Sequence, residues 1–176
     1  VFNLSASPWT WQKNAKRSRV VHDVLARSPL PFFYINHVGA QNNGKNILVF
    51  DGDSCAYGAD GSIVARAPPW KEALLLVPGS EPPPAPQTEI EAIVDATSAG
   101  IRHLDHVRGA ANNYLIGVSG GIDSSVVAAL LAQAVGPKRV RAVNTPTRFN
   151  AQITQDNAKD LCAELGIDYL SLPIGE

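Results

Sequence analysis

Helical and extended patterns alternate along the second half of the chain, and this alternation restricts the fold more than any other feature. The expected elements are, in order, helix 88–108, strand 113–118, helix 124–135, strand 140–144, helix 151–165 and strand 168–173. The pair Gly136-Pro137 and the single Gly166 are typical of the points at which helices stop. Strands that alternate with helices predict an α/β fold with a parallel, doubly wound sheet. In such sheets, ligands bind beyond the carboxyl ends of the strands.

A glycine-rich turn joins the first of these strands to the helix at 124–135. Its sequence is Ser-Gly-Gly-Ile-Asp-Ser at residues 119–124, and it lies at the helix N-terminus. Unpaired backbone N–H groups and the positive end of the helix dipole point to this turn, and glycines let an anion approach the backbone closely. The hydroxyls of Ser119, Ser124 and Ser125 are further donors. The turn therefore predicts a phosphate site, and an ordinary strand-to-helix turn is the alternative.

Asp123 stands where a P-loop would have lysine, and the dinucleotide fingerprint Gly-x-Gly-x-x-Gly is also absent. A carboxylate repels bare phosphate. Because Mg²⁺ commonly bridges one or two carboxylates to phosphate oxygens, a metal ion resolves this conflict. The turn is thus expected to bind a magnesium nucleotide, with Asp123 as a metal ligand.

The first part of the chain has a different pattern of helix and strand signals. One basic helix is expected, followed by short strands at 32–36, 47–50, 54–57 and 62–65. A hairpin turn is expected at 59–62. These elements predict an α+β layer structure of mainly antiparallel ribbons. Five prolines at residues 77–86 favour an extended linker. Thr88 and Glu91 then form a capping-box pattern that begins a new helix. The expected organisation is a domain at 1–77, a linker at 78–87 and a domain at 88–176.

The composition is that of a globular protein, with 45% hydrophobic and 18% charged residues and a net charge of −1. This balance predicts neither nucleic acid nor a membrane as partner. A cytoplasmic location and a homo-oligomeric assembly are expected. Cys55 and Cys162 have no partner at metal or disulfide spacing, which favours buried free thiols.

Three motifs of the first part and the glycine-rich turn together resemble the glutamine-dependent NAD synthetase family. The motifs are Asn-Leu-Ser-Ala-Ser at 3–7, Asn-His-Val-Gly at 36–39 and Phe-Asp-Gly-Asp-Ser at 50–54. The resemblance implies the C-terminal part of a nitrilase-like αββα sandwich, followed by the start of an ATP-pyrophosphatase domain. It places the glutaminase Glu, Lys and Cys before residue 1. The chain, which lacks Met, is therefore expected to be an internal piece that is inactive alone and carries no catalytic residue.

The resemblance also assigns binding residues. Ser7 and Lys13 match glutamine contacts, with a helix cap and a solvated helix face as their alternatives, and Asp123 matches a Mg²⁺ ligand. The residues that match the ATP-binding loop are Gly117, Val118, Ser119, Gly120, Gly121, Ile122, Asp123 and Ser124. Residues 144–150 correspond to a segment that contacts adenosine in relatives, although Thr147 and Phe149 depart from the usual Pro-Ser-Arg-Tyr. Arg148 is expected to face either phosphate or solvent.

The implied activity is that of a ligase. ATP adenylates nicotinic acid adenine dinucleotide, and ammonia from glutamine displaces AMP to give NAD. Two alternatives are another amidotransferase or ligase with a pyrophosphatase loop and, for this piece in isolation, a non-catalytic ATP-binding module.

Overall fold

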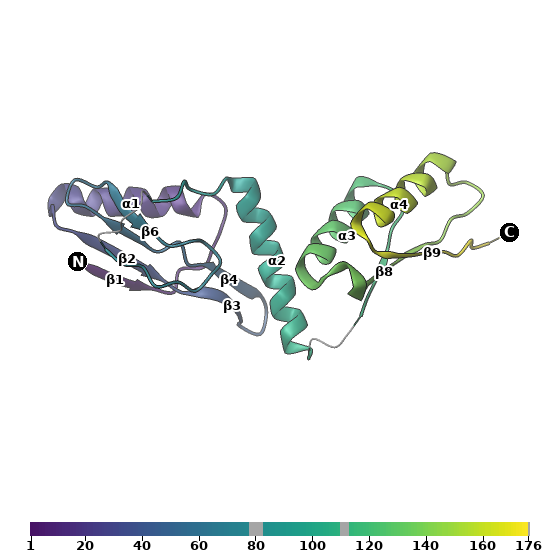
Figure 1. The fold of residues 1–176 in the computed structure, drawn as a ribbon, viewed down its shortest axis with the longest axis horizontal. Helices are drawn as coiled ribbons and strands as arrows, with labels where there is room; N and C mark the ends of the chain where they lie inside the picture. Colours follow the sequence, from purple (N-terminus) through teal and green to yellow (C-terminus); the bar gives the residue numbers. More distant parts are fainter. Residues whose placement is uncertain (78–82, 110–112, 176) are drawn as a thin grey trace. The chain divides into compact units, whose positions relative to one another are not determined.

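The computed structural model describes residues 1–77, 83–109 and 113–175, and the chain divides into two compact units (Figure 1). The first unit is Val1–Gly100 and the second is Ile101–Glu176. Helix α2 (Glu89–Val107) contains the boundary. No helix of the described ranges is both long and apolar enough to cross a membrane.

The first unit is built on a mixed sheet and a separate two-stranded ribbon. Its elements are β1 (Phe2–Ser5), α1 (Lys13–Arg27), β2 (Phe32–Asn36), β3 (Val38–Asn42), β4 (Ile47–Asp51), β5 (Cys55–Tyr57) and β6 (Ile63–Arg66). The sheet order is β1-β2-β5-β6, and β3 pairs with β4. The pairings are antiparallel except between β1 and β2, which are parallel because α1 forms the crossover between them. Strand β3 was not predicted, because Gly39, Gln41 and Asn42 weaken its strand pattern.

Helix α1 packs against β2 and β5 to form the core of this unit. Val21 and Leu25 of the helix contact the strand residues Phe32, Tyr34, Cys55 and Tyr57. The expected hairpin between β5 and β6 is confirmed, since the Gly58 N–H donates to the Ser62 carbonyl at 2.8 Å.

The second unit is a three-stranded parallel sheet in the order β7-β8-β9. Its elements are β7 (Tyr114–Gly117), α3 (Ile122–Val135), η1 (Pro137–Arg139), β8 (Val140–Asn144), α4 (Gln152–Leu165) and β9 (Asp168–Ser171). The two helices pack on the same face over a core of small and β-branched side chains: Val118, Ala128, Ala132, Val140, Ala142, Ala158, Cys162 and Ile167. Both cysteines are buried and free. The α/β fold with parallel strands is thus confirmed, while a second helix layer, which a doubly wound sheet requires, stays a prediction.

The helix ends follow the local signals in the sequence. The Thr88 N–H donates to Glu91 Oε2 at 2.9 Å, and the Glu91 N–H donates back to Thr88 Oγ1 at 3.3 Å, as the capping box predicts. Gly166 is left-handed at φ 68°, and the next N–H bonds the Cys162 carbonyl at 2.9 Å, which ends α4. Helix α3 begins at Ile122, two residues before the expected start, because Gly121 already has the extended conformation of an N-cap.

Asp53 is an acidic residue in an unfavourable environment. It is 8% exposed, has a left-handed backbone at φ 45°, and its carboxylate lies 3.3 Å from Arg66 Nε. Burial raises the pKa of Asp53 from 3.8 to about 6, although Arg66 opposes this shift.

We therefore expect the free energy of unfolding to fall as the pH rises from about 4 to about 6. The folded state keeps the Asp53 proton over this range whereas the unfolded state has lost it, so the change should approach about 3 kcal/mol and stop above pH 6. Urea unfolding at a series of pH values measures this profile. Asp53→Asn should flatten it, and Asp23→Asn, an exposed control on α1, should not. Parallel profiles for wild type and Asp53→Asn would contradict this account.

Candidate functional site

The turn between β7 and α3 leaves the N-terminus of α3 without a side-chain cap. The N-cap residue is Gly121, and the first intrahelical bond runs from the Ser125 N–H to the Gly121 carbonyl at 3.2 Å. The backbone N–H groups of Ile122, Asp123 and Ser124 precede this bond and have no acceptor within the helix. Three donors at the positive end of the helix dipole form the geometry that binds an anion.

The serine hydroxyls of the turn bond to the turn itself. The hydroxyls of Ser124 and Ser125 donate to the Gly121 carbonyl at 3.1 and 2.8 Å. The Ser119 N–H donates to Ser124 Oγ at 3.2 Å, and the Gly121 N–H donates to Ser119 Oγ at 3.3 Å. The hydroxyls, which were predicted as donors to phosphate, therefore also fix the path of the backbone.

Gly120 allows this turn to contact the start of α4. Its φ is +83°, and a Cβ at this position would lie 1.8 Å from the carbonyl oxygen of Thr154. No side chain can occupy that space without moving the backbone. In contrast, Gly121 has an ordinary φ of −83°, and a Cβ there would come no closer than 3.5 Å to a neighbour, the Ser119 Oγ.

Asp123 lies in the first turn of α3 and is exposed. Over the described residues, no group of three or more His, Cys, Asp or Glu side chains could hold a metal ion by itself. A single exposed carboxylate beside an anion site nevertheless suits Mg²⁺, which keeps several waters and takes its other ligands from phosphate. The residues present therefore fit a metal ion that arrives with a nucleotide.

The segment after β8 lies at the same carboxyl edge of the sheet. Thr147 bonds to Asn150 through both its N–H and its hydroxyl, each at 2.8 Å. The Arg148 guanidinium lies 4.8 Å from the centre of the Phe149 ring, and this ring is 82% exposed. An exposed aromatic ring with a cation above it is a surface on which a planar ligand group can stack.

In the first unit, the structure brings Ser7 and Lys13 together. Both line a hollow of about 270 Å³, which Arg17 and Tyr34 also line. Helix α1 begins at Lys13 with Gln12 as its N-cap, so Ser7 does not cap the helix. The Ser7 N–H donates to Asn36 Oδ1 at 2.9 Å, and this bond fixes the backbone beside the hollow.

A buried ion pair beneath this hollow was missed by the sequence analysis. Arg17 donates to both carboxylate oxygens of Asp51, at 2.6 and 2.8 Å, and to the Ser7 carbonyl at 2.9 Å. The Arg17 and Asp51 side chains are 9% and 2% exposed. Asn36 also reaches Asp51 Oδ1, at 3.3 Å, so the three motifs of the first part meet around one guanidinium. The three motifs were the available signal for this site in the sequence. The sequence does not show that Arg17 is the ion-pair partner of Asp51.

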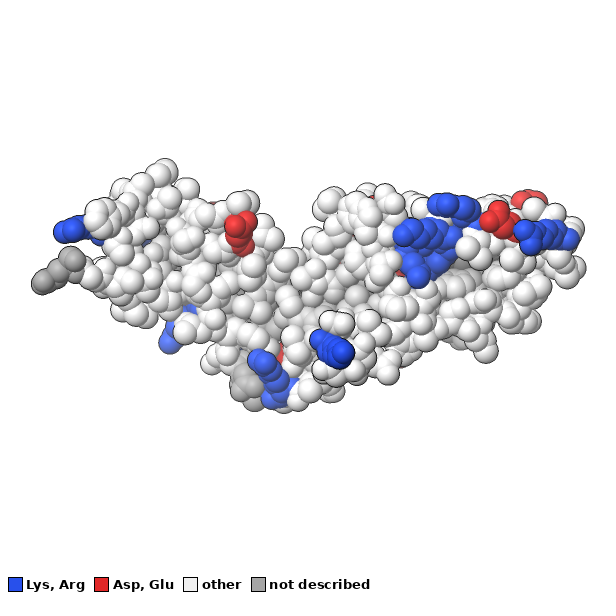
Figure 2. Space-filling view, turned by 180° about the vertical axis from the view of Figure 1, so that it is seen from behind, with Lys and Arg blue, Asp and Glu red and all other residues white. Residues whose placement is uncertain are grey.

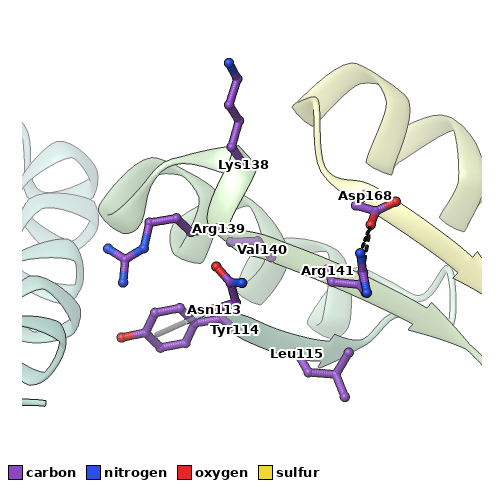
Figure 3. A pocket seen from close by; sticks show the side chains of 8 residues that line it. All are labelled: Asn113, Tyr114, Leu115, Lys138, Arg139, Val140, Arg141 and Asp168. Atoms are coloured by element: carbon purple, nitrogen blue, oxygen red, sulfur yellow. Dashed lines mark hydrogen bonds and ion pairs between the residues drawn. The ribbon is translucent and has the colours of Figure 1, made fainter. Parts of the chain in front are cut away.

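A second hollow, of about 250 Å³, lies at the amino ends of β7 and β8, opposite the glycine-rich turn (Figure 3). Its arginines are paired: Arg141 bonds to Asp168 at 2.6 Å, and Arg139 bonds to Asp105 of α2, also at 2.6 Å. Its charge is therefore largely compensated within the chain. On the face drawn in Figure 2, Lys and Arg side chains form small groups, and Asp and Glu side chains lie among them.

The chain is similar to known proteins over nearly its whole length. Residues 93–176 match the family model of NAD synthase, and nearly all of the chain aligns with curated synthetases. The chain is related to the glutamine-dependent NAD(+) synthetases. The resemblance seen in the sequence is thus confirmed.

The matched synthetases are about three times as long as this chain. The synthetase from Synechocystis is 32% identical over an alignment of 184 positions, which covers 99% of the chain and 32% of the relative. The synthetase from Rhodobacter capsulatus is also 32% identical, over 92% of the chain and 30% of the relative. The solved synthetase of Acinetobacter baumannii, in complex with ADP, superposes with a TM-score of 0.82 and is 27% identical in sequence. The matched region covers 98% of this chain and 34% of the Acinetobacter baumannii chain. The chain spans about a third of the length of these synthetases.

The close contact of Gly120 gives a direct test of the turn. Gly120→Ala should lower the free energy of unfolding by more than about 2 kcal/mol, because it combines left-handed strain with a backbone clash. Gly121→Ala is the matched control and should cost less than about 1 kcal/mol. Urea unfolding followed by circular dichroism measures both values. If both variants lose the same free energy of unfolding, the contact with the Thr154 carbonyl is not what makes Gly120 necessary.

Proposed function

We propose that the protein containing this sequence is a ligase that forms NAD from nicotinic acid adenine dinucleotide. ATP would adenylate the substrate carboxylate and release pyrophosphate, and ammonia derived from glutamine would displace AMP. The observation that carries the proposal is the uncapped N-terminus of α3 with Asp123 in its first turn, within residues that match the NAD synthase family. The ADP complex of the Acinetobacter baumannii relative supports a nucleotide ligand.

The turn can stabilise the departing pyrophosphate. The backbone N–H groups of Ile122, Asp123 and Ser124 are fixed before the reaction, so they can meet developing negative charge without reorganising. Asp123 would hold Mg²⁺, which supplies electrostatic stabilisation of phosphate oxygens when bound. The proposed ATP-binding residues are Gly117, Val118, Ser119, Gly120, Gly121, Ile122, Asp123 and Ser124.

The first unit is proposed to be part of a nitrilase-like glutaminase domain. In the hollow beside α1, the Lys13 ammonium can pair with the carboxylate of glutamine, and the Ser7 hydroxyl can bond its polar groups. The catalytic Glu, Lys and Cys would lie outside this sequence. Cys55 is an unsuitable nucleophile, because it is 4% exposed and burial raises the pKa of its thiol.

Asp123→Asn should lower the rate of Mg²⁺-dependent pyrophosphate release about tenfold or more, because a neutral amide is a poor Mg²⁺ ligand. The assay uses the protein that contains this sequence, with ATP and nicotinic acid adenine dinucleotide, over a series of Mg²⁺ concentrations. Asp160→Asn makes the same change at an exposed position of α4 and should leave the rate unchanged. A higher rate with xanthylate or aspartate as acceptor would favour another ligase of this loop class. ATP binding without product would favour a non-catalytic module.

Lys13→Ala should raise the KM for glutamine about tenfold or more, because it removes a charge-assisted hydrogen bond to the substrate. NAD formation with ammonium chloride in place of glutamine should stay at the wild-type rate. Ser7→Ala should give a smaller increase in KM, and Lys45→Ala, an exposed control in the turn between β3 and β4, should give none. A loss of the ammonia-dependent rate in Lys13→Ala would count against a role confined to glutamine.

A further inference from the structure

Asn36, the last residue of β2, holds the backbone of Ser7 with its side chain. Its Oδ1 accepts from the Ser7 N–H at 2.9 Å, and its Nδ2 donates to the Ser7 carbonyl at 3.3 Å. A carboxamide offers an acceptor and a donor side by side, whereas an ionised carboxylate only accepts. The amide of Asn36 is therefore suited to bind both backbone polar groups of one residue.

This side chain takes over where the backbone pairing of two strands ends. Strands β1 and β2 run parallel up to the pair Ser5 and Asn36, and the His37 N–H donates to the Ser5 carbonyl at 2.9 Å. Strand β1 ends at Ser5, so Ser7 lies beyond the ladder. Ser7 is held next to β2 by the Asn36 amide in place of backbone bonds.

The Asn36 amide is itself fixed in orientation. The Asn36 N–H donates to Ser54 Oγ at 3.0 Å, and its Nδ2 also lies 3.3 Å from Asp51 Oδ1. Asp51 is bound by Arg17, whose Nη2 donates to the Ser7 carbonyl at 2.9 Å. If the amide turned over, its oxygen would face the Asp51 carboxylate and the Ser7 carbonyl, which are both acceptors. The bonds to Ser7 therefore have one favoured arrangement.

These bonds leave one polar group of Ser7 for a ligand. Its N–H and its carbonyl are both bonded to Asn36, so the hydroxyl is what Ser7 can offer to the hollow that it lines with Lys13. A donor on a fixed backbone loses little freedom when a ligand binds, and this preorganisation favours affinity. The position of the hydroxyl thus depends on a side chain from another strand.

We propose that Asn36 is a positioning residue for glutamine, because its carboxamide holds the Ser7 backbone so that the Ser7 hydroxyl faces the substrate. The inference rests on the proposed function, since it needs glutamine in the hollow lined by Ser7 and Lys13. Asn36 acts through Ser7 and does not itself contact the substrate. Its loss weakens glutamine binding and leaves the use of free ammonia unchanged.

The test is the KM for glutamine, measured by NAD formation with the protein that contains this sequence. Asn36→Ala removes both bonds to Ser7 and should raise this KM about fivefold, close to the effect of Ser7→Ala and typical of one neutral hydrogen bond. The kcat with glutamine and the rate with ammonium chloride should stay at wild-type values, because a purely structural loss lowers the amount of active enzyme and not its affinity. Asn46→Ala, an exposed control in the turn between β3 and β4, should leave the KM unchanged.

A double-mutant cycle shows whether Asn36 acts through Ser7. In the Ser7→Ala background the hydroxyl is already missing, so adding Asn36→Ala should raise the KM by less than about twofold more. If the two residues bound glutamine independently, their effects would multiply to about 25-fold.

The outcomes separate this inference from the proposed function. If the wild-type protein forms no NAD from glutamine, the glutamine site and the inference fall together. If Lys13→Ala and Ser7→Ala raise the KM and Asn36→Ala does not, only the inference falls. Multiplied effects in the double variant, or a lower ammonia-dependent rate with an unchanged KM, would also overturn it. Should the alanine variant not fold, Asn36→Asp keeps the acceptor for the Ser7 N–H and removes the donor, and a wild-type KM in that variant would count against the inference.

Discussion

The contact between Gly120 and the Thr154 carbonyl is the constraint on which the candidate nucleotide site depends. A Cβ at residue 120 would lie 1.8 Å from that oxygen, so the turn can approach α4 only as bare backbone. The same contact sets the path of the chain into Gly121, whose extended conformation begins α3. The direction in which the first N–H groups of α3 point is thus decided by a glycine two residues earlier and by a carbonyl of the next helix.

In the first unit, the hollow lined by Ser7 and Lys13 is also positioned by one contact to a helix. Here the contact is made by a side chain, that of Arg17, and not by bare backbone as at Gly120. Arg17 reaches from α1 to Asp51 at the end of β4 and to the Ser7 carbonyl. The pair is almost fully buried, so removal of either partner would leave an uncompensated charge. In both units, a segment without regular structure is held by a specific polar or steric contact to a helix. That contact determines which groups of the segment remain available to a ligand.

The sequence predicted the second unit better than the first, for physical reasons. Helices α3 and α4 and strands β7 and β8 have clear periodicity and glycine signals, so their bounds differ from the expected ones by two residues or fewer. The first unit depends on contacts between distant residues, such as Arg17 with Asp51, which local patterns do not encode. The same is true of the sites: the turn at 119–124 is contiguous in the sequence and was predicted, whereas the close approach of Gly120 to the Thr154 carbonyl becomes visible only when α4 is placed beside the turn.

The missing side-chain cap of α3 has a consequence for stability as well as for binding. The hydroxyls of Ser124 and Ser125 turn back to the Gly121 carbonyl, so neither caps the N–H groups of the first turn. An anion at this position would itself be the N-cap and would complete the hydrogen bonding of the helix. Since such a ligand binds the folded state and not the unfolded chain, the order of the first turn of α3 would rise and fall with the concentration of nucleotide. The ligand would then be a structural component of the helix that binds it.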